Sequence, residues 1–164
     1  MDFEKAQQEI TQWIQDFVEK PNPLLNGWAP CPYARQARIE NKISIRLGMD
    51  PYFDLCRTYR FGIRDFDVVA YVYDPQEWPL ERFRSWQQAG VANPHGLYVL
   101  EDHPSEVENV NGVVMNQGTY AMLFVQNQTK LEEAAQQLAK KGYYTGWPEH
   151  YLQDLFKGRE DPRL

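Results

Sequence analysis

The stretch Phe-Asp-Val-Val-Ala-Tyr-Val-Tyr at residues 66–73 is the strongest strand signal in this chain. Its apolar residues fall on both faces of an extended backbone, which indicates a strand that is covered on each side. Weaker strand signals occur at 41–47, 96–100 and 120–125. We therefore expect a central sheet of about four strands organised around residues 66–73.

Between these strands, apolar residues recur at helical spacing. The expected helices cover residues 2–19, 51–62, 79–89, 129–141 and 147–156, with one more short helix from Pro32. Alternating strands and helices predict an α/β or α+β sandwich of about four strands packed with five or six helices. The first three strands could be parallel, and the fourth would then return antiparallel after the long loop 105–118. We expect one globular domain over residues 1–164, with a frayed tail at 159–164.

Charge and composition exclude several classes of partner. A net charge of −6 disfavours nucleic acid and anionic membrane surfaces, because both attract basic proteins. No apolar run reaches the ~20 residues that cross a bilayer, and the N-terminal helix carries acidic residues, unlike a signal peptide. The two cysteines, Cys31 and Cys56, have neither CxxC nor zinc-type spacing, which is typical of reduced thiols. We therefore predict a cytoplasmic protein with no nucleic-acid and no membrane partner.

The turn Pro30-Cys31-Pro32 is the strongest candidate for chemistry. Proline is well tolerated at the first helical position, so we interpret Cys31 as the N-cap of a short helix. A cysteine there faces unpaired N–H groups and the positive end of the helix dipole, and Arg35 and Arg38 add positive charge; all of these favour a thiolate. The alternative is a small apolar residue in a rigid bend, and the sequence leaves both interpretations open.

Asp74 and His103 each follow a predicted strand. Like Cys31, each of them precedes a proline. If those strands are parallel, both side chains lie at the carboxyl edge of the sheet, where open α/β sheets bind ligands. One hypothesis makes Cys31 a nucleophile, His103 its general base and Asp74 the group that orients the imidazole. The sequence does not place Cys31 relative to that edge.

In this hypothesis the protein is a small enzyme that performs acyl or group transfer, or hydrolysis, on a small anionic substrate. Arg35 and Arg38 are the expected anion-binding groups. Asn109 and Asn111 are expected to bind the substrate as well. They lie in the loop 105–118, which we expect to close over the substrate, since loops of this length are often functional. This enzyme requires no cofactor.

Two alternatives use the same residues differently. In the first, His103, Asp74, Asp102 and Cys31 hold a mononuclear zinc or iron ion, the metals that best suit a thiolate beside imidazole and carboxylate ligands. In the second, the protein is a non-catalytic binding or accessory module for a partner protein. Its prolines then only terminate elements, because Asp-Pro and His-Pro are common turn signals. The 14% aromatic content also predicts apolar surface that would suit a homodimer.

At residues 31–34 (Cys-Pro-Tyr-Ala) the chain resembles an uncharacterised bacterial family of small proteins with a Leu-Cys-Pro-Phe-Ala signature. In that family an amphipathic helix precedes the signature, and His-Pro pairs fall near the positions of Asp74 and His103. The chain departs from the pattern at Asp74, where the family has histidine, and at Gln126, where it has arginine. The resemblance implies no particular activity, but it implies that Cys31, Asp74 and His103 belong to one site.

Overall fold

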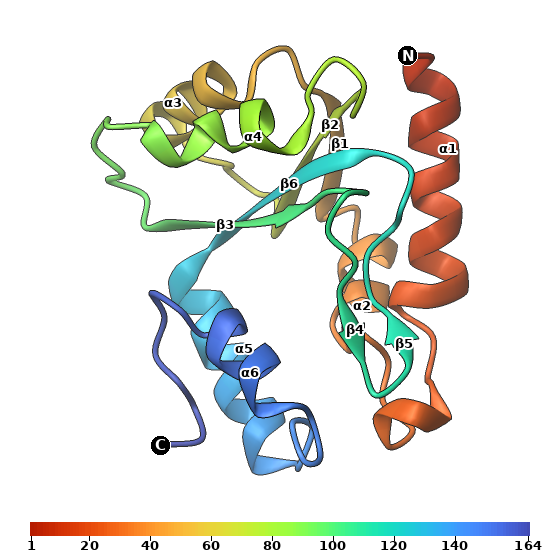
Figure 1. The fold of residues 1–164 in the computed structure, drawn as a ribbon. Coiled ribbons are helices and arrows are strands. Elements are labelled where there is room, and N and C mark those ends of the chain that lie inside the picture. Colours follow the sequence, from red (N-terminus) through yellow and green to blue (C-terminus); the bar gives the residue numbers. More distant parts are fainter.

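The centre of the molecule is a four-stranded sheet in the computed structural model, which describes residues 1–164 (Figure 1). The strands lie in the order β1 (Ile43–Leu47), β2 (Val68–Tyr73), β6 (Ala121–Asn127) and β3 (Leu97–Asp102). Five of the six β2 residues are buried, because helices cover both faces of the sheet. The stretch 66–73 therefore supplies an inner strand, and the predicted α/β sandwich is confirmed.

The strand directions agree with the prediction, which left the order of the strands open. β1 and β2 pair in parallel, while β6 runs antiparallel to both of its neighbours. β3 therefore points in the same direction as β1 and β2, yet it pairs with β6 and not with β2. The chain that follows β3 returns β6 into the position between β2 and β3. The carboxyl ends of β2 and β3 consequently lie at the same end of the sheet, on either side of the start of β6.

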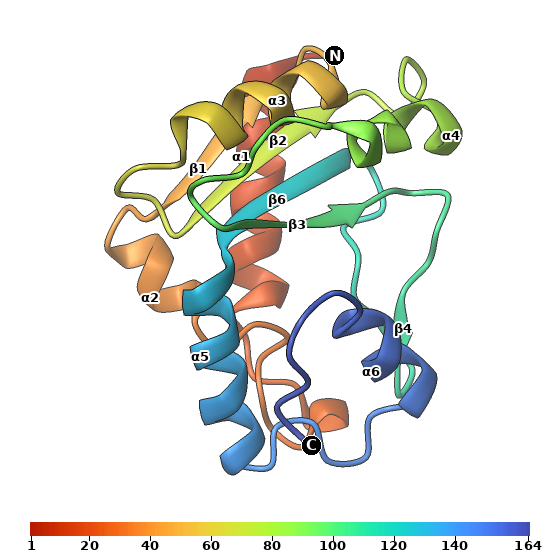
Figure 2. The same ribbon diagram turned by 90° about the vertical axis from the view of Figure 1, so that its left-hand side faces the viewer.

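Different helices cover the two faces of the sheet, as Figures 1 and 2 show. One face carries α1 (Phe3–Trp13), and the other carries α3 (Pro51–Phe61) and α4 (Leu80–Phe83). Ile10 of α1 belongs to the same apolar cluster as Val72, whereas Leu55 of α3 belongs to the same cluster as Tyr71. Because successive strand residues point to opposite faces, neighbouring residues of β2 serve two separate cores.

The expected helix 2–19 has two parts. Asp2 caps α1, since its Oδ1 accepts a hydrogen bond from the Lys5 N–H at 3.1 Å. After Trp13 the chain continues as a π-helical turn, Ile14–Val18. A 3₁₀ turn at Pro23–Leu25 then leads to α2, Ala34–Ile39. π-helical turns are rare in proteins, and those that occur often lie at functional sites. This one borders the cavity described below.

A buried polar group connects α3 to β2. Asp50 caps α3 as predicted, and Asp54, one turn later, is 3% exposed. The Asp54 carboxylate accepts hydrogen bonds from the backbone N–H groups of Met49 and Asp50 and from the Tyr73 hydroxyl at 3.0 Å. Gly48 lies so close to the Tyr73 ring that a Cβ there would be 2.1 Å from the ring carbon Cε1. Only glycine fits at this position without displacing the ring.

A second core, rich in aromatic residues, lies beside the sheet. Its elements are α5 (Gln128–Lys140), α6 (Glu149–Leu155) and a hairpin of β4 (Asn109–Val110) and β5 (Val113–Val114). Tyr143, Tyr144 and Trp147 pack there with ring centroids 4.9–5.6 Å apart. The hairpin lies inside the segment predicted as the long loop 105–118. Its turn, Asn111-Gly112, has positive φ at both residues, which is the strongest short hairpin signal a sequence carries.

Two predicted helices have different limits in the structure. The segment 79–89 contains α4 followed by a 3₁₀ turn, Arg84–Gln88. α5 begins after Asn127, whose side chain accepts a hydrogen bond from the Lys130 N–H at 3.1 Å, and not after Thr129. No helix combines the length and the hydropathy of a membrane-spanning segment.

The tail predicted to fray at 159–164 makes specific contacts. The Arg159 guanidinium lies 5.1 Å from the centroid of the Phe156 ring. Arg163 forms ion pairs with Asp161 at 2.6 Å and with Glu149 of α6 at 3.0 Å. These contacts fold the last residues back onto α6.

Candidate functional site

Cys31 lies where the chain returns to the end of the N-terminal helix. Its N–H donates to the Val18 carbonyl at 2.9 Å, and its own carbonyl accepts from the Ala34 N–H at 3.1 Å. The following helix begins at Ala34 and has six residues, so Tyr33 occupies the N-cap position that we predicted for Cys31. That prediction is wrong because residues 31–33 form a turn before the helix begins.

The environment of the Cys31 thiol favours the protonated form. The residue is exposed to solvent, but it also lines an apolar cavity, whose walls partly desolvate the thiol. This desolvation raises the pKa of the Cys31 thiol, and the N–H groups of Tyr33 and Ala34 oppose the effect only in part. The predicted lowering of this pKa is therefore wrong: the apolar wall outweighs the backbone donors.

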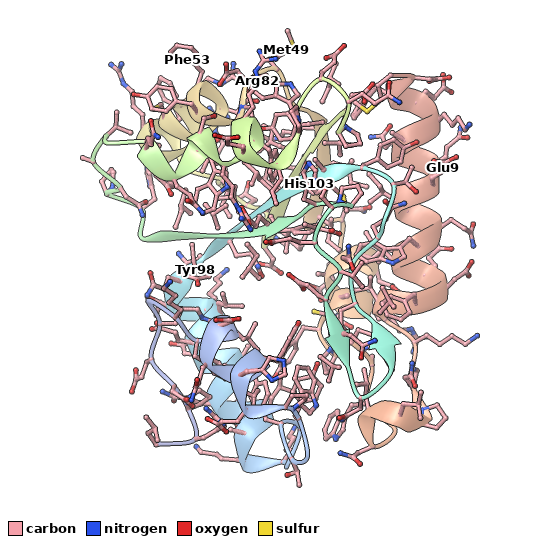
Figure 3. The ribbon with its side chains drawn as sticks, in the orientation of Figure 1. Glu9, Met49, Phe53, Arg82, Tyr98 and His103 are labelled. Atoms are coloured by element: carbon pink, nitrogen blue, oxygen red, sulfur yellow. The ribbon has the colours of Figure 1, made fainter.

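His103 is a structural histidine in this fold. It is 3% exposed, and its ring lies inside the molecule near the end of β3 (Figure 3). Its Nε2 lies 2.9 Å from the Trp78 carbonyl oxygen, which can only accept, so Nε2 carries the proton. Its Nδ1 accepts the Ser105 N–H at 3.1 Å. Both ring nitrogens are thus used within the protein, which leaves neither for a substrate or a thiol.

Asp74 lies at the same end of the sheet as His103, as predicted, but the two side chains serve different partners. The Asp74 Oδ1 accepts the Gln76 N–H at 2.9 Å, as in an Asx turn. The Asp74 carbonyl accepts the Trp78 N–H at 2.9 Å. Asp74 therefore stabilises the turn after β2 and does not orient the His103 imidazole.

Cys31 lies at the opposite end of the sheet from Asp74 and His103. The cavity that contains it is also lined by Val68, the first residue of β2, whereas Asp74 follows the last. Six residues of strand span about 20 Å. The cavity also opens on the α1 face, whereas the His103 ring contacts Phe83 on the α3–α4 face. The structure does not bring the three residues together.

The predicted substrate-binding residues have local partners. Arg38 forms a two-point ion pair with Glu19, with nitrogen–oxygen distances of 2.8 and 2.7 Å. Arg35 is exposed on α2. Asn109 accepts the Gly112 N–H at 2.9 Å. Asn111 donates to the carbonyl oxygen of Gly146 at 3.2 Å. The two asparagines therefore shape the hairpin and connect it to the segment before α6.

The residues proposed for a metal centre do not converge either. No group of three or more His, Cys, Asp or Glu side chains in the chain is arranged to hold a metal ion. His103, Asp74 and Cys31 are placed as described above. Asp102 is buried: its Oδ2 accepts the Gln117 N–H at 2.9 Å, and its Oδ1 has no partner. Burial raises the pKa of Asp102 to about 6.

The cavity itself is the feature that the sequence did not predict. Its volume is about 410 Å³, and 14 of its 18 lining residues are hydrophobic. The lining comes from α1 and its π turn, α2, β1, β2, β6 and α5, and includes Ile14, Val18, Cys31, Ile43, Phe124 and Leu131. Volumes of this size are typical of sites for small molecules.

Alanines create this space. Ala34 and Ala37 of α2, Ala70 of β2 and Ala134 of α5 all face the cavity, so their short side chains leave it unfilled. At its polar rim, Lys130 forms an exposed ion pair with Asp67 at 3.5 Å. A single alanine in a helix or strand is ordinary. The four alanines leave a cavity only because the fold brings α2, β2 and α5 together.

No family model matches this chain, and neither a curated protein nor a solved structure matches it.

Proposed function

We propose that this protein is a binding protein for a small, mainly apolar ligand with one polar end, held in the cavity between the N-terminal helix, α2, α5 and the sheet. The observation that carries the proposal is the apolar lining of a 410 Å³ space in the folded chain. Apolar cavity walls lack contact partners on one side, so a ligand of matching shape would regain dispersion contacts and remove apolar surface from water.

The distribution of polar groups supports a ligand with one polar end. Asp67, Gln126, Asn127 and Lys130 all lie where β2 begins, β6 ends and α5 begins. The other 14 lining residues are hydrophobic. An apolar body inside the cavity and one hydrogen-bonding or charged group at this rim would match the lining.

The raised pKa of Cys31 supports binding over thiol chemistry. A protonated thiol is a poor nucleophile, and neither His103 nor Asp74 lines the cavity to act as its base. In this proposal Cys31 acts as a small apolar wall residue. This proposal shares the non-catalytic character of the second alternative in the sequence analysis, but its ligand is a small molecule and not a partner protein.

A cavity-filling substitution tests the proposal with the neutral apolar dye Nile red, whose fluorescence increases in apolar surroundings. Ala134→Phe places a ring in the cavity from α5, and Gln136→Phe adds the same ring to the exposed opposite side of the same helix. We expect saturable binding by the natural chain, at least about a tenfold weaker affinity in Ala134→Phe, and an unchanged affinity in Gln136→Phe. Bound dye should also slow alkylation of Cys31.

Absence of saturable dye binding would contradict the proposal, and so would equal affinity in the two variants. Thermal unfolding of both variants shows whether each is folded before its affinity is compared. Mass spectrometry of an organic extract of the purified protein then identifies a ligand that co-purifies with the natural chain and not with Ala134→Phe.

A further inference from the structure

The outer side of α3 carries an exposed strip of aromatic and cationic side chains. Phe53, Arg57, Arg60 and Phe61 stand at positions i, i+4, i+7 and i+8, which lie on one side of a helix. Phe53 is 68% exposed and Phe61 is 60% exposed. Large aromatic side chains exposed together are unusual on a monomeric surface and mark sites of interaction.

This strip forms one side of a groove. The segment 91–94 forms the other side through Val91, Ala92 and Pro94, and the enclosed volume is about 570 Å³. Met49, 72% exposed, precedes α3, and Figure 3 shows it projecting outward, as Phe53 does, at the top of the molecule. The strip from Phe53 to Phe61 runs about 12 Å along the helix. Its length and openness fit an extended segment of chain better than a small molecule.

The charges in the groove are positive and largely uncompensated. Arg57 is 64% exposed and reaches only Asp54, at 3.4 Å. Asp54 is already satisfied by two backbone N–H groups and the Tyr73 hydroxyl. Arg60 lies over the Phe61 ring at 5.4 Å and forms no ion pair. A cationic groove in a chain with net charge −6 is a local reversal of sign.

We propose that the groove between α3 and the segment 91–94, which we name the α3 groove, is a docking surface for an acidic peptide segment of a partner protein that also carries aromatic or aliphatic side chains. Arg57 and Arg60 would bind its carboxylates, and Phe53, Phe61 and Val91 would pack against its apolar side chains. Arginine and aromatic residues are the types that dominate binding energy at protein interfaces.

Charge complementarity favours this partner over two others. Two copies of this chain meeting through the α3 groove would place like-charged arginines against each other, which disfavours a self-association surface here. A nucleic acid would meet the two arginines but would be repelled by the remainder of an acidic protein. The α3 groove is also separate from the cavity of the proposed function, because α3 and α1 cover opposite faces of the sheet.

Selection from a phage-displayed library of random peptides against the immobilised full chain tests the proposal. We expect enriched peptides to combine Asp or Glu with Phe, Leu or Trp. Fluorescence anisotropy then measures each labelled peptide on the natural chain, on Arg57→Glu/Arg60→Glu and on Arg35→Glu, which reverses an exposed arginine of α2. The double variant should lose at least about tenfold in affinity, because it replaces both cationic donors of the groove with carboxylates that repel the peptide. Arg35→Glu should keep the affinity of the natural chain.

Several results would overturn the proposal. These are enrichment of no peptide, enrichment of peptides without acidic residues, or equal binding by the double variant. Tighter binding of labelled oligo-dT than of the peptides would assign the groove to nucleic acid. Dimerisation in sedimentation experiments that the double variant abolishes would assign it to a second copy. Phe53→Ser removes one exposed aromatic side chain and should independently lower the affinity for the peptides. Circular dichroism verifies that each variant is folded.

Discussion

Substituting Gly48 by alanine tests how tightly the end of β1 packs on Tyr73. A Cβ at residue 48 would lie 2.1, 2.4 and 2.6 Å from Cε1, Cζ and Cδ1 of the ring. Favourable carbon contacts lie at about 3.5–4.0 Å, so the ring would have to move by more than about 1 Å. Tyr73 is 1% exposed and packs against Trp78 and Phe83, which leaves it no free space.

Two energetic costs add up to the expected loss in the free energy of unfolding of Gly48→Ala. Forcing extra atoms into a filled core costs about 1–3 kcal/mol. Displacing the ring also takes its hydroxyl away from the Asp54 Oδ2, now at 3.0 Å, and a buried group that loses its partner costs about 1–3 kcal/mol. We therefore expect Gly48→Ala to lower the free energy of unfolding by about 2–6 kcal/mol, a large share of the ~5–15 kcal/mol that a domain typically has.

Urea denaturation followed by tryptophan fluorescence measures this change. Gly90→Ala is the matched control, because a Cβ there meets only the Gln88 carbonyl oxygen, at 3.7 Å, and we expect a change within about 0.5 kcal/mol. Tyr73→Phe removes the hydroxyl alone and should cost about 1–2 kcal/mol. A loss below about 1 kcal/mol in Gly48→Ala, or equal losses in the two glycine variants, would refute the packing argument.

Two further predictions concern titratable groups. Burial raises the pKa of Asp102 to about 6 from an ordinary value of 3.8, so ionisation costs the folded chain more than the unfolded one. The free energy of unfolding should therefore fall by up to about 2–3 kcal/mol as pH rises from about 4 through about 6. In urea titrations, Asp102→Asn should make the free energy of unfolding less dependent on pH over this range. Asp65→Asn, which changes an exposed carboxylate, should leave the pH dependence unchanged. The raised pKa of Cys31 should make its alkylation by iodoacetamide at pH ~7.5 slower than that of a cysteine in a short peptide, measured in a Cys56→Ser background; an equal or faster rate would contradict the assigned environment.

Local patterns in the sequence were sufficient for most of the elements. The apolar run at 66–73 predicts an inner strand, and Asp50 followed by Pro51 predicts the start of α3, because both signals depend on residues close in the chain. The pair Asn111-Gly112 is an equally clear hairpin signal, but the acidic and polar residues around it are typical of a long loop and conceal the two short strands. Even the shared sheet end of Asp74 and His103 followed from strand direction.

The placement of Cys31 and both proposed binding surfaces depended on tertiary structure. Which end of the sheet a turn approaches is decided by long-range packing, here by the hydrogen bond from Cys31 to the carbonyl of Val18 and by the insertion of β6 between β2 and β3. The cavity exists because short side chains from α2, β2 and α5 meet across a space, and the α3 groove exists because the segment 91–94 lies beside that helix. Hydrophobic periodicity and helix capping depend on residues that are close in the sequence. A binding site is formed by residues from several elements, and only the tertiary structure determines which of these residues meet.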